Sequence, residues 1–347
     1  MNQKPLIGMM LDWSMDVDFF RACAVAAAYY GADFYYFRIS DIGDHSITGT
    51  KLENDEWISD EFPYPDAIYD YTRRREVPRF EEAYRKIGHI PMGHTIKGRS
   101  MTKSKVYRII QKDKQLKQSL IPYMTVREAE DLFTFMQKHQ KVIFKTNGGF
   151  AGQKILTAEL KNDGIELFDQ QYLHYFTKDD LSRLSEMLKS KRYFAQKLIH
   201  SVTPQGHPFH LRVHLSKNGK NRWVIAFRSI SLSLNPHISI TNSKHTYRGT
   251  STWGAFLQNQ YNEEENGPMQ QMIDDYSLKM ANYLEEATGG GFHEIALDLG
   301  TDERNRIWLF EAGIGLPGTL YHQLQMALPA MAYTLYLLKK AAPKSSL

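Results

Sequence analysis

The sequence contains very little cysteine and very little net charge. Cys23 is its only cysteine, so an internal disulfide and a cysteine-based zinc site are excluded, and a reducing compartment is favoured. Lysine and arginine total 43 against 39 acidic residues, which gives a formal net charge of +4. This excess is too small to indicate a nucleic-acid partner. Any function that needs positive charge is therefore expected to be local.

The sequence also lacks a secretory signal and an unbroken membrane-spanning run. Its N-terminus has one lysine and a short apolar stretch interrupted by Asp12 and Asp16, which favours a cytoplasmic protein. Residues 312–338 carry no formal charge and exceed the length that a membrane span needs. Glycines and prolines such as Gly313 and Pro329 interrupt them, so a loop and a buried helix are favoured over a membrane span.

The pattern of elements predicts several lobes. A chain of 347 residues is too long for one core and indicates two or three packed lobes. Residues 5–38 predict a strand, a helix and a second strand, and a further strand is expected at 66–71. A polar, basic segment near residue 100 predicts the first boundary. The expected class is a small α/β lobe followed by α+β lobes, which usually place a ligand in the cleft between them.

The later part of the chain predicts two helices, a series of strands, and then a long helix over 269–286 followed by two final strands. Thr125 and Glu128 have the spacing of a capping box at the start of the second helix. The final helix follows the last strand. No internal repeat or low-complexity tract interrupts this order.

A glycine-rich segment, KTNGGFAGQK, lies between two predicted strands. Because no helix follows it, the Walker and Rossmann types of phosphate loop are excluded. Lys145 closes the first strand, and the loop contains Gly148, Gly149 and Gly152. Such a hairpin can cover a polyphosphate with its backbone N–H groups while the lysine adds a point charge. An ordinary hairpin turn with a solvated lysine remains the alternative.

Two acids lie on the predicted C-terminal hairpin, Asp298 in ALDLG and Glu311 in WLFEAG. A turn centred near Arg304 would place them almost opposite each other on neighbouring strands, where they would repel unless a cation lies between them. Magnesium prefers one or two protein carboxylates together with phosphate oxygens and water. Their apolar surroundings make a purely solvated charged face the less favoured alternative.

The strand HLRVHL places His210, Arg212 and His214 on one face by its period of two. A histidine metal site is the less favoured interpretation, because no carboxylate lies at ligand spacing. Arg212 and, on the next strand, Arg228 are better interpreted as clamps for phosphate or carboxylate, since guanidinium binds both bidentately. Surface ion pairs remain the alternative for each arginine.

These features together resemble the YheC/YheD-type endospore coat-associated family of the ATP-grasp superfamily. The resemblance rests on the order and spacing of KVYRIIQKDKQLKQSLIPYM, VIFKTNGGFAGQKI, YFAQKLI, PFHLRVHLSKNGK and FHEIALDLGTDERNRIWLFEAGIGLPG. It implies an N-terminal α/β domain at 1–100 and two α+β subdomains, at 101–199 and 200–347, that enclose ATP. It also implies a ligase that phosphorylates a carboxylate, captures the acyl phosphate with an amine or similar nucleophile, and releases ADP and phosphate.

The resemblance also implies roles for individual residues. Lys105 and Lys145 would contact the ATP phosphates under a lid made by Gly148, Gly149 and Gly152. The adenine would lie along a strand and its continuation, and the transferred phosphoryl group and Mg²⁺ would lie on the arginine strand and the C-terminal hairpin. The residues assigned to these places are Gln196, Lys197 and Ile199 for the adenine, Arg212, Arg228 and Asn242 for the phosphoryl group, and Asp298 and Glu311 for Mg²⁺. His210, which stands where the family usually has an acid, is grouped with the cofactor-binding residues.

Two further departures from the family pattern affect the expected activity. Gly313 stands where similar enzymes have an asparagine two residues after the metal-binding glutamate, within GIGLPG. The segment KHTYRGT replaces a glycine pair expected after Asn242. These changes predict a weakened second magnesium, an altered acceptor site, or a protein that binds nucleotide without turnover.

Two functions are therefore expected from the sequence. The first is an ATP-dependent ligase in a sporulating cell that acts on a small carboxylate and an amine or peptide. The second is a degenerate ATP-grasp protein that binds Mg-ATP or helps to assemble the spore coat through coat proteins. For both functions, neither a nucleic-acid partner nor a membrane span is expected. The expected location is the cytoplasm, with the spore coat as the alternative.

Overall fold

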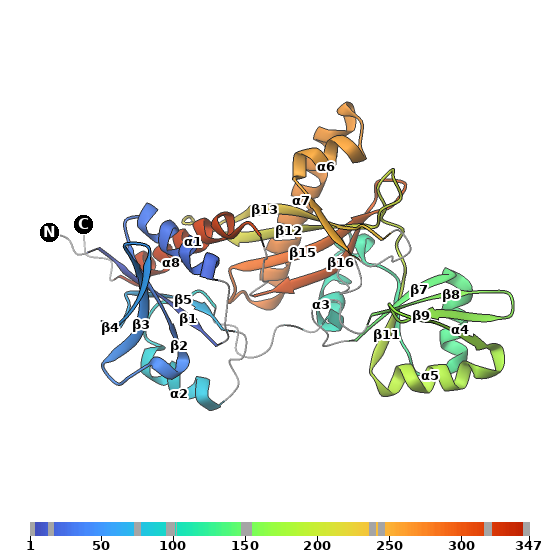
Figure 1. The fold of residues 1–347 in the computed structure, drawn as a ribbon, viewed down its shortest axis with the longest axis horizontal. Helices are drawn as coiled ribbons and strands as arrows, with labels where there is room; N and C mark the ends of the chain where they lie inside the picture. The colour runs from blue at the N-terminus through green and yellow to red at the C-terminus, as the bar shows by residue number, and fades with distance from the viewer. Residues whose placement is uncertain are drawn as a thin grey trace.

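The computed structural model describes residues 4–12, 17–72, 78–94, 101, 103–146, 155–235, 241, 247–315 and 321–342. They form three β-sheets, here called the N-terminal, central and C-terminal sheets. Figure 1 shows the N-terminal sheet at one end of the molecule, the C-terminal sheet in the middle and the central sheet at the other end. The domain boundaries near residues 100 and 200 stay a prediction.

The N-terminal sheet has the strand order β4-β3-β2-β1-β5. β1 is parallel to β2 and β5, and α1 connects β1 to β2, so the predicted strand, helix, strand unit is confirmed. The sequence did not predict the edge hairpin of β3 and β4, whose two-residue turn has positive φ at Asn54 and Asp55. The elements are β1 Leu6–Leu11, α1 Val17–Tyr29, β2 Asp33–Arg38, η1 Ile39–Asp41, β3 Ser46–Glu53, β4 Glu56–Pro63, β5 Ala67–Tyr71 and α2 Pro78–Ile87.

The central sheet has the order β10-β9-β8-β7-β11-β6, and α4 and α5 cover one of its faces. The predicted capping box is wrong. Thr125 pairs with Phe194 as the last residue of β6, and α4 begins at Ala129 after Glu128, whose side chain makes no capping bond. The elements are α3 Lys103–Ile110, η2 Leu116–Ser119, β6 Tyr123–Thr125, α4 Ala129–His139, β7 Lys141–Thr146, β8 Leu156–Leu160, β9 Gly164–Phe168, β10 Leu173–Thr177, η3 Lys178–Asp180, α5 Leu181–Ser190 and β11 Tyr193–Lys197.

The C-terminal sheet has the order β14-β13-β12-β15-β16, with every described pair antiparallel. The long helix α7 packs on one face of this sheet, and it begins earlier than predicted because Asn262 and Glu265 form a capping box. It ends at Thr288 and is capped by Gly289, whose φ of 78° suits glycine. The elements are β12 Phe209–Lys217, β13 Trp223–Ser233, β14 Arg248–Ser251, α6 Trp253–Gln260, α7 Glu263–Thr288, β15 Glu294–Thr301, β16 Ile307–Ile314 and α8 Gln323–Ala341.

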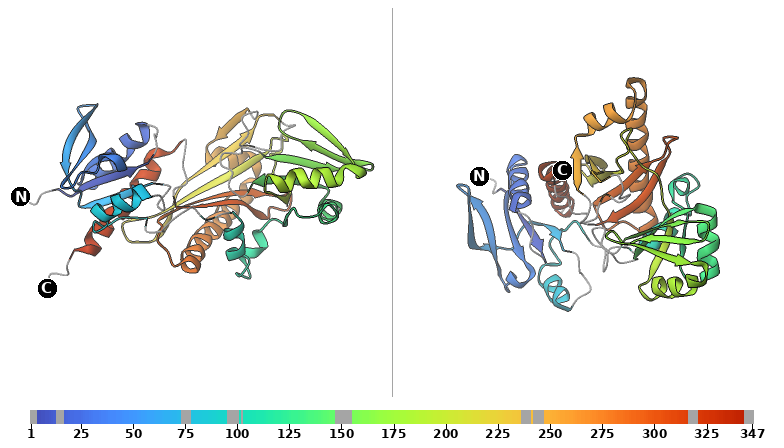
Figure 2. Two further views of the ribbon diagram at one scale, coloured as in Figure 1. Left: turned by 90° about the horizontal axis from the view of Figure 1, so that it is seen from below. Right: turned by 45° about the vertical axis from the view of Figure 1, so that its right-hand side comes forward.

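Two helices join the sheets into one assembly. Val106 and Ile110 of α3 are buried in the core of the C-terminal sheet, although they precede the central sheet in the chain. The last helix, α8, returns to the N-terminal sheet, where Met326 and Met331 are buried with Phe19 of α1. Figures 1 and 2 show α8 beside α1. Among the helices of the described residues, none is long and apolar enough to cross a membrane.

Candidate active site

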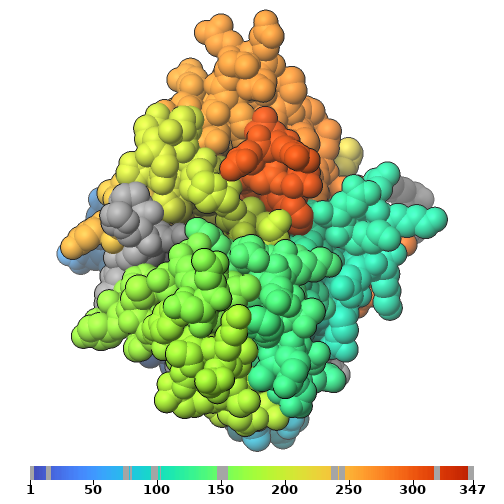
Figure 3. All heavy atoms as spheres, turned by 90° about the vertical axis from the view of Figure 1, so that its right-hand side faces the viewer, coloured from blue at the N-terminus to red at the C-terminus, as the bar shows by residue number. Residues whose placement is uncertain are grey.

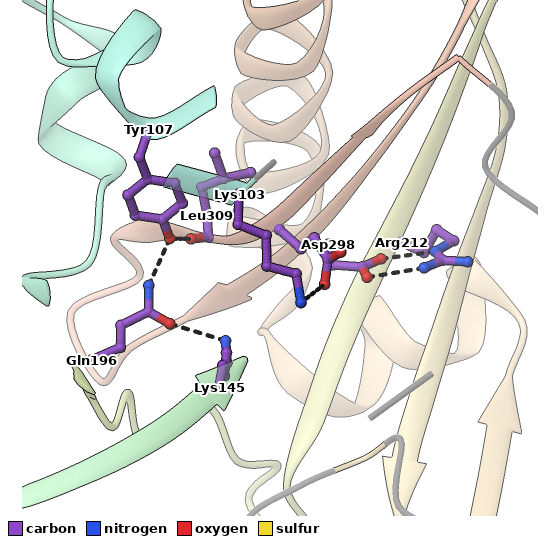
Figure 4. Close-up of polar contacts among 8 residues, drawn as sticks. Lys103, Tyr107, Lys145, Gln196, Arg212, Asp298 and Leu309 are labelled. Carbon is purple, nitrogen blue, oxygen red and sulfur yellow. Dashed lines mark hydrogen bonds and ion pairs between the residues drawn. The ribbon is translucent and has the colours of Figure 1, made fainter. Parts of the chain in front are cut away.

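A row of charged side chains crosses the face of the C-terminal sheet opposite α7. Arg212 of β12 lies directly opposite Asp298 of β15, and Asp298 lies directly opposite Glu311 of β16. Arg212 donates two hydrogen bonds to the Asp298 carboxylate, from Nε at 2.7 Å and from Nη2 at 2.9 Å (Figure 4). The predicted pairing of Asp298 with Glu311 is therefore confirmed, and Arg212 supplies a cation on one side of it.

A β-bulge aligns the two acids. From Leu299 to Thr301 the hairpin pairs in one register, and between Leu299 and Asp298 the register shifts by one residue. Without that shift, Glu311 would lie opposite Leu297 and would point to the other face of the sheet. The bulge therefore brings Glu311 beside Asp298, in keeping with the frequent position of bulges next to active sites.

Glu311 also has a cationic partner, which the sequence did not identify. Lys103 of α3 places its Nζ 3.2 Å from Glu311 Oε2. The predicted Lys105 is exposed on the same helix. A signal was present in the sequence, because Lys103 and Tyr107 are four residues apart and share one face of a helix, whereas Lys105 does not. That face of α3 is turned toward β16.

A chain of hydrogen bonds connects the central sheet to the same place. Lys145 at the end of β7 donates to Gln196 Oε1 at 2.9 Å, and Gln196 Nε2 donates to the Tyr107 hydroxyl at 2.6 Å. Tyr107 in turn donates to the carbonyl oxygen of Leu309 at 2.8 Å. Figure 4 shows these contacts arriving from three different elements at the β15–β16 hairpin. Figure 3 shows the tip of that hairpin, in orange-red, beside the central sheet in green.

The charges at this place change one another's protonation. Burial acts to raise the pKa of the Asp298 carboxyl, but the charge and hydrogen bonds of Arg212 outweigh it and lower the pKa to about 2. Burial and the positive charge of Lys103 together lower the pKa of Lys145 to about 8. Burial also lowers the pKa of His210 to about 4, so this histidine is neutral at pH 7. A place with several shifted pKa values is typical of functional sites.

The structure does not bring Arg228 to this face. Arg228 lies opposite Val213, so it points to the α7 side of the sheet, where it forms a bidentate pair with Asp274, with Nε at 2.8 Å from Oδ1. The cause is a bulge between His214 and Leu215. Counted from the turn, Arg228 would lie opposite Arg212, but the bulge shifts the register and places Ser229 there instead. The predicted contact of Arg228 with a phosphoryl group at the Arg212 site is therefore corrected.

Comparison with known proteins identifies the family. A model of the YheC/D-like ATP-grasp family matches residues 94–324. The chain belongs to the YheC/D-like ATP-grasp family. Endospore coat-associated protein YheD of Bacillus subtilis (strain 168) is 22% identical over 294 residues, which cover 77% of this chain and 60% of YheD. The chain thus spans about 60% of the length of that curated relative.

Solved structures show the same fold at low identity. The ATP-grasp ligase PsnB, complexed with a phosphomimetic variant of its minimal precursor, Mg and ADP, has a TM-score of 0.54 at 8% identity, covering 95% of this chain and 98% of PsnB. The D-cycloserine synthetase DcsG has a TM-score of 0.52 at 10% identity, covering 97% of this chain and 99% of DcsG. Together with the family match, they confirm the predicted ATP-grasp fold.

The residues beside Lys145 are suited to binding the adenine of a nucleotide, as the ATP-grasp fold requires. Gln196 lies opposite Ile143 on the same face of the central sheet. Ile143 belongs to a small apolar cluster that is separate from the main core of this sheet. The other members of the cluster are Ile155, Phe168 and Leu198. This cluster offers an apolar surface for a planar base. Lys197 and Ile199 lie at and just beyond the end of β11. The predicted Gly148, Gly149, Gly152 and Asn242 lie outside the described residues.

The acids suit magnesium as a two-carboxylate site. Asp298 and Glu311 offer oxygens from neighbouring strands, which is the protein share that Mg²⁺ takes when phosphates and water supply the other ligands. The next pair on the same face is Ala296 with Gly313, which offers no side-chain oxygen. Within the described ranges, no group of three histidine, cysteine or acidic side chains is placed to hold a metal. The histidine metal alternative therefore has no support there.

Proposed function

We propose that this protein is an ATP-dependent carboxylate ligase that forms a C–N bond through an acyl phosphate. The observation that carries the proposal is the convergence of Lys103, Lys145 and Arg212 on the Asp298–Glu311 pair from three separate elements. Phosphoryl transfer needs charge neutralisation and alignment more than covalent help from the protein. Fixed cations around two carboxylates meet that need.

Each residue has a separate task in this proposal. Lys145 binds the ATP phosphates, and its hydrogen bond to Gln196 holds its ammonium group in place. Arg212 neutralises the carboxylate being phosphorylated and remains aligned through its two bonds to Asp298. Asp298 and Glu311 would hold Mg²⁺, which supplies charge neutralisation at the phosphates when bound. Lys105, Lys197, Ile199 and His210 keep their predicted supporting roles, as do Gly148, Gly149, Gly152 and Asn242, which lie outside the described residues.

The proposed substrates are a small carboxylic acid and an amine or peptide. A peptide is included because the structurally similar macrocyclase MdnC, with a TM-score of 0.50, is bound with the precursor peptide MdnA. A role in sporulation or at the spore coat, with coat proteins as partners, follows from the relationship to YheD. We place the reaction in the cytoplasm, because ATP and small metabolites are available there.

One observation favours a second candidate, a degenerate ATP-grasp protein that binds Mg-ATP without turnover. Gly313 shares the face of Glu311 but offers no ligand atom, so a second Mg²⁺ would have one protein oxygen fewer. Water can replace a missing ligand of Mg²⁺, which is why the ligase remains the first proposal. Mg-ATP binding is common to the two candidates, and only turnover separates them.

The test is a hydroxylamine trap. The protein is incubated with Mg-ATP, hydroxylamine and a panel of carboxylic acids and amino acids, and ADP and hydroxamate are measured. The carboxylate oxygen attacks the γ-phosphorus and releases ADP; hydroxylamine then attacks the acyl carbon, forming the hydroxamate and releasing phosphate. Equal amounts of ADP and hydroxamate, lost in Asp298→Asn and Lys145→Ala, are expected. Mg-ATP binding without ADP formation for any acid would exclude the ligase and leave the second candidate.

A further inference from the structure

Arg248 is the first residue of β14, on the side of the C-terminal sheet that lies away from the acid pair. It is opposite Ser233 of β13, and its Nη2 donates to the hydroxyl oxygen of Ser231 at 2.7 Å. Ser231 is itself opposite His210 of β12, so it lies on the same face as Arg212. The Arg248 guanidinium therefore extends over the face that carries Arg212 and Asp298.

The cations of this face differ in their partners. Arg212 is paired with Asp298, and Lys103 is paired with Glu311. Arg248 and Lys145 contact only a hydroxyl and an amide oxygen as polar partners, and neither meets a carboxylate in the part of the chain that the structure describes. Two positive charges are thus uncompensated there, and they come from different sheets: Lys145 from the end of β7 in the central sheet, and Arg248 from β14 in the C-terminal sheet.

Among the described residues, the carboxylate that acts on Arg248 is Asp298, which is already paired with Arg212. His210, which lies between Arg212 and the edge of this face, is neutral at pH 7 because burial lowers its pKa. Partial burial and the neighbouring charge of Arg212 lower the pKa of Arg248, and Tyr321 and Asp298 oppose them only in part. Arg248 is exposed at this edge of the sheet, so an anion can reach its guanidinium directly, and a charge-assisted hydrogen bond to it is stronger than a neutral one.

Ser231 adds a second donor at the same point. Its oxygen accepts the hydrogen bond from Arg248, and its own hydroxyl proton has no acceptor among the described residues. Ser231 is almost completely buried, with 3% of the residue's surface exposed. A guanidinium N–H and a hydroxyl at one place can together bind both oxygens of a carboxylate.

We propose that Arg248 and Ser231 form a carboxylate subsite, and that the substrate acid of this protein is a dicarboxylate. One carboxylate is phosphorylated beside Lys145 and Arg212, and the second is held by Arg248. This inference rests on the proposed ligase function and narrows its substrate class. It assigns Lys145 to the nucleotide and Arg248 to the substrate, so the two uncompensated charges have different ligands.

The experiment measures binding, so it does not depend on turnover. Isothermal titration in the presence of Mg-ADP compares glutarate with valerate and L-glutamate with L-norvaline, pairs that differ chiefly in the second carboxylate. The wild type is expected to bind each dicarboxylate at least about tenfold more tightly, the effect of one good charge-assisted contact. Arg248→Gln is expected to remove this preference while leaving valerate and Mg-ADP binding unchanged. Arg248→Lys keeps the positive charge but lacks the paired N–H donors of the guanidinium, so it should retain part of the preference for the dicarboxylate.

Controls separate this inference from the ligase proposal. Arg306→Gln removes an exposed arginine that pairs with Asp302 at the hairpin turn, and it should leave every affinity unchanged. Ser231→Ala provides the same test if Arg248→Gln does not fold. Three results would overturn the subsite. The wild type could bind the dicarboxylate and its monocarboxylate partner equally well, or it could bind no dicarboxylate. Arg248→Gln could also weaken the binding of both acids by the same factor. A wild-type protein that does not bind Mg-ADP would instead contradict the proposed function.

Discussion

The C-terminal sheet carries an arginine–aspartate pair on each of its faces. Arg212 and Asp298 form one pair, with bonds of 2.7 and 2.9 Å, and Arg228 and Asp274 form the other on the α7 side. Both pairs are bidentate and mostly shielded, with side-chain exposures of 31% and 9% for the first and 21% and 17% for the second. Bond geometry and burial therefore do not distinguish them.

Their neighbours do distinguish them. Asp298 lies beside Glu311, and the charges of Arg212 and Lys145 lower its pKa. Arg228 is 5.9 Å from the centre of the Trp253 ring and contacts only the helix side of the sheet. An ion pair packed against an aromatic ring and a helix fixes the position of that helix. An ion pair beside a second acid and an uncompensated lysine can bind a phosphate and its metal.

The largest expected effect comes from Asp298→Asn. Asparagine keeps the shape and one acceptor but removes the charge that holds Arg212 and would hold Mg²⁺. We expect the rate of ADP formation to fall about 1,000-fold, or about 4 kcal/mol of transition-state stabilisation. The measurement is ADP release with the acid that gives the highest wild-type rate. Asp274→Asn makes the same change on the opposite face and should alter that rate less than about threefold per folded molecule. Similar losses in both variants would contradict the distinction between the faces.

The second prediction concerns stability on the α7 face. Asp274→Asn leaves Arg228 without a charged partner in a half-buried place, so we expect the free energy of unfolding to fall by about 2 kcal/mol. Urea denaturation followed by circular dichroism measures it. Arg306→Gln, which breaks an exposed pair at the hairpin turn, should change stability by less than about 0.5 kcal/mol. An Asp274 variant as stable as the wild type would show that this pair does not hold α7.

The two bulges explain how much of this arrangement the sequence could predict. The turn at 302–306 fixed the approximate pairing of Asp298 with Glu311, because hairpin register follows from the turn. The same reasoning applied to β12 and β13 would put Arg228 opposite Arg212, on the wrong face, since the bulge after His214 moves every later pair by one residue. No residue in HLRVHL indicates a bulge, so the shift in register could not be predicted from the sequence.

Elements with a strong apolar period were predicted, and weakly apolar ones were missed. β1 and β5 are buried along almost their whole length, and the residues of both appear as apolar runs. β4 and β10 expose most of their residues and lie at sheet edges, so no alternation marks them. The contact of Lys103 with Glu311 joins residues about 200 positions apart, and only the packing of α3 on the C-terminal sheet creates it.

The third prediction tests the hydrogen-bond chain that connects Lys145 to the hairpin. Tyr107→Phe removes the hydroxyl that accepts from Gln196 and donates to the Leu309 carbonyl. We expect Mg-ATP affinity to fall about fivefold, or about 1 kcal/mol, because Gln196 no longer holds the lysine. Tyr276→Phe removes another shielded tyrosine hydroxyl, which bonds to Ser119 at 2.7 Å away from Lys145, and should leave the affinity unchanged. Equal affinities in all three proteins would rule out a role for the chain in ATP binding.

The smallest expected effect is a dependence on pH that only the Asp298 face has. Lys145 has a pKa of about 8, lowered by burial and by Lys103, so the free protein loses this charge as the pH rises through 8. The protonated fraction falls about threefold between pH 7.5 and 8.5, and Mg-ATP affinity should fall by the same factor. Lys145→Arg stays protonated over this range and should bind Mg-ATP with an affinity that does not change with pH. Asp274→Asn, altered on the other face, should keep the wild-type slope. If the Mg-ATP affinity of Lys145→Arg still falls as the pH rises, another group is titrating, and Lys145 does not bind the phosphates.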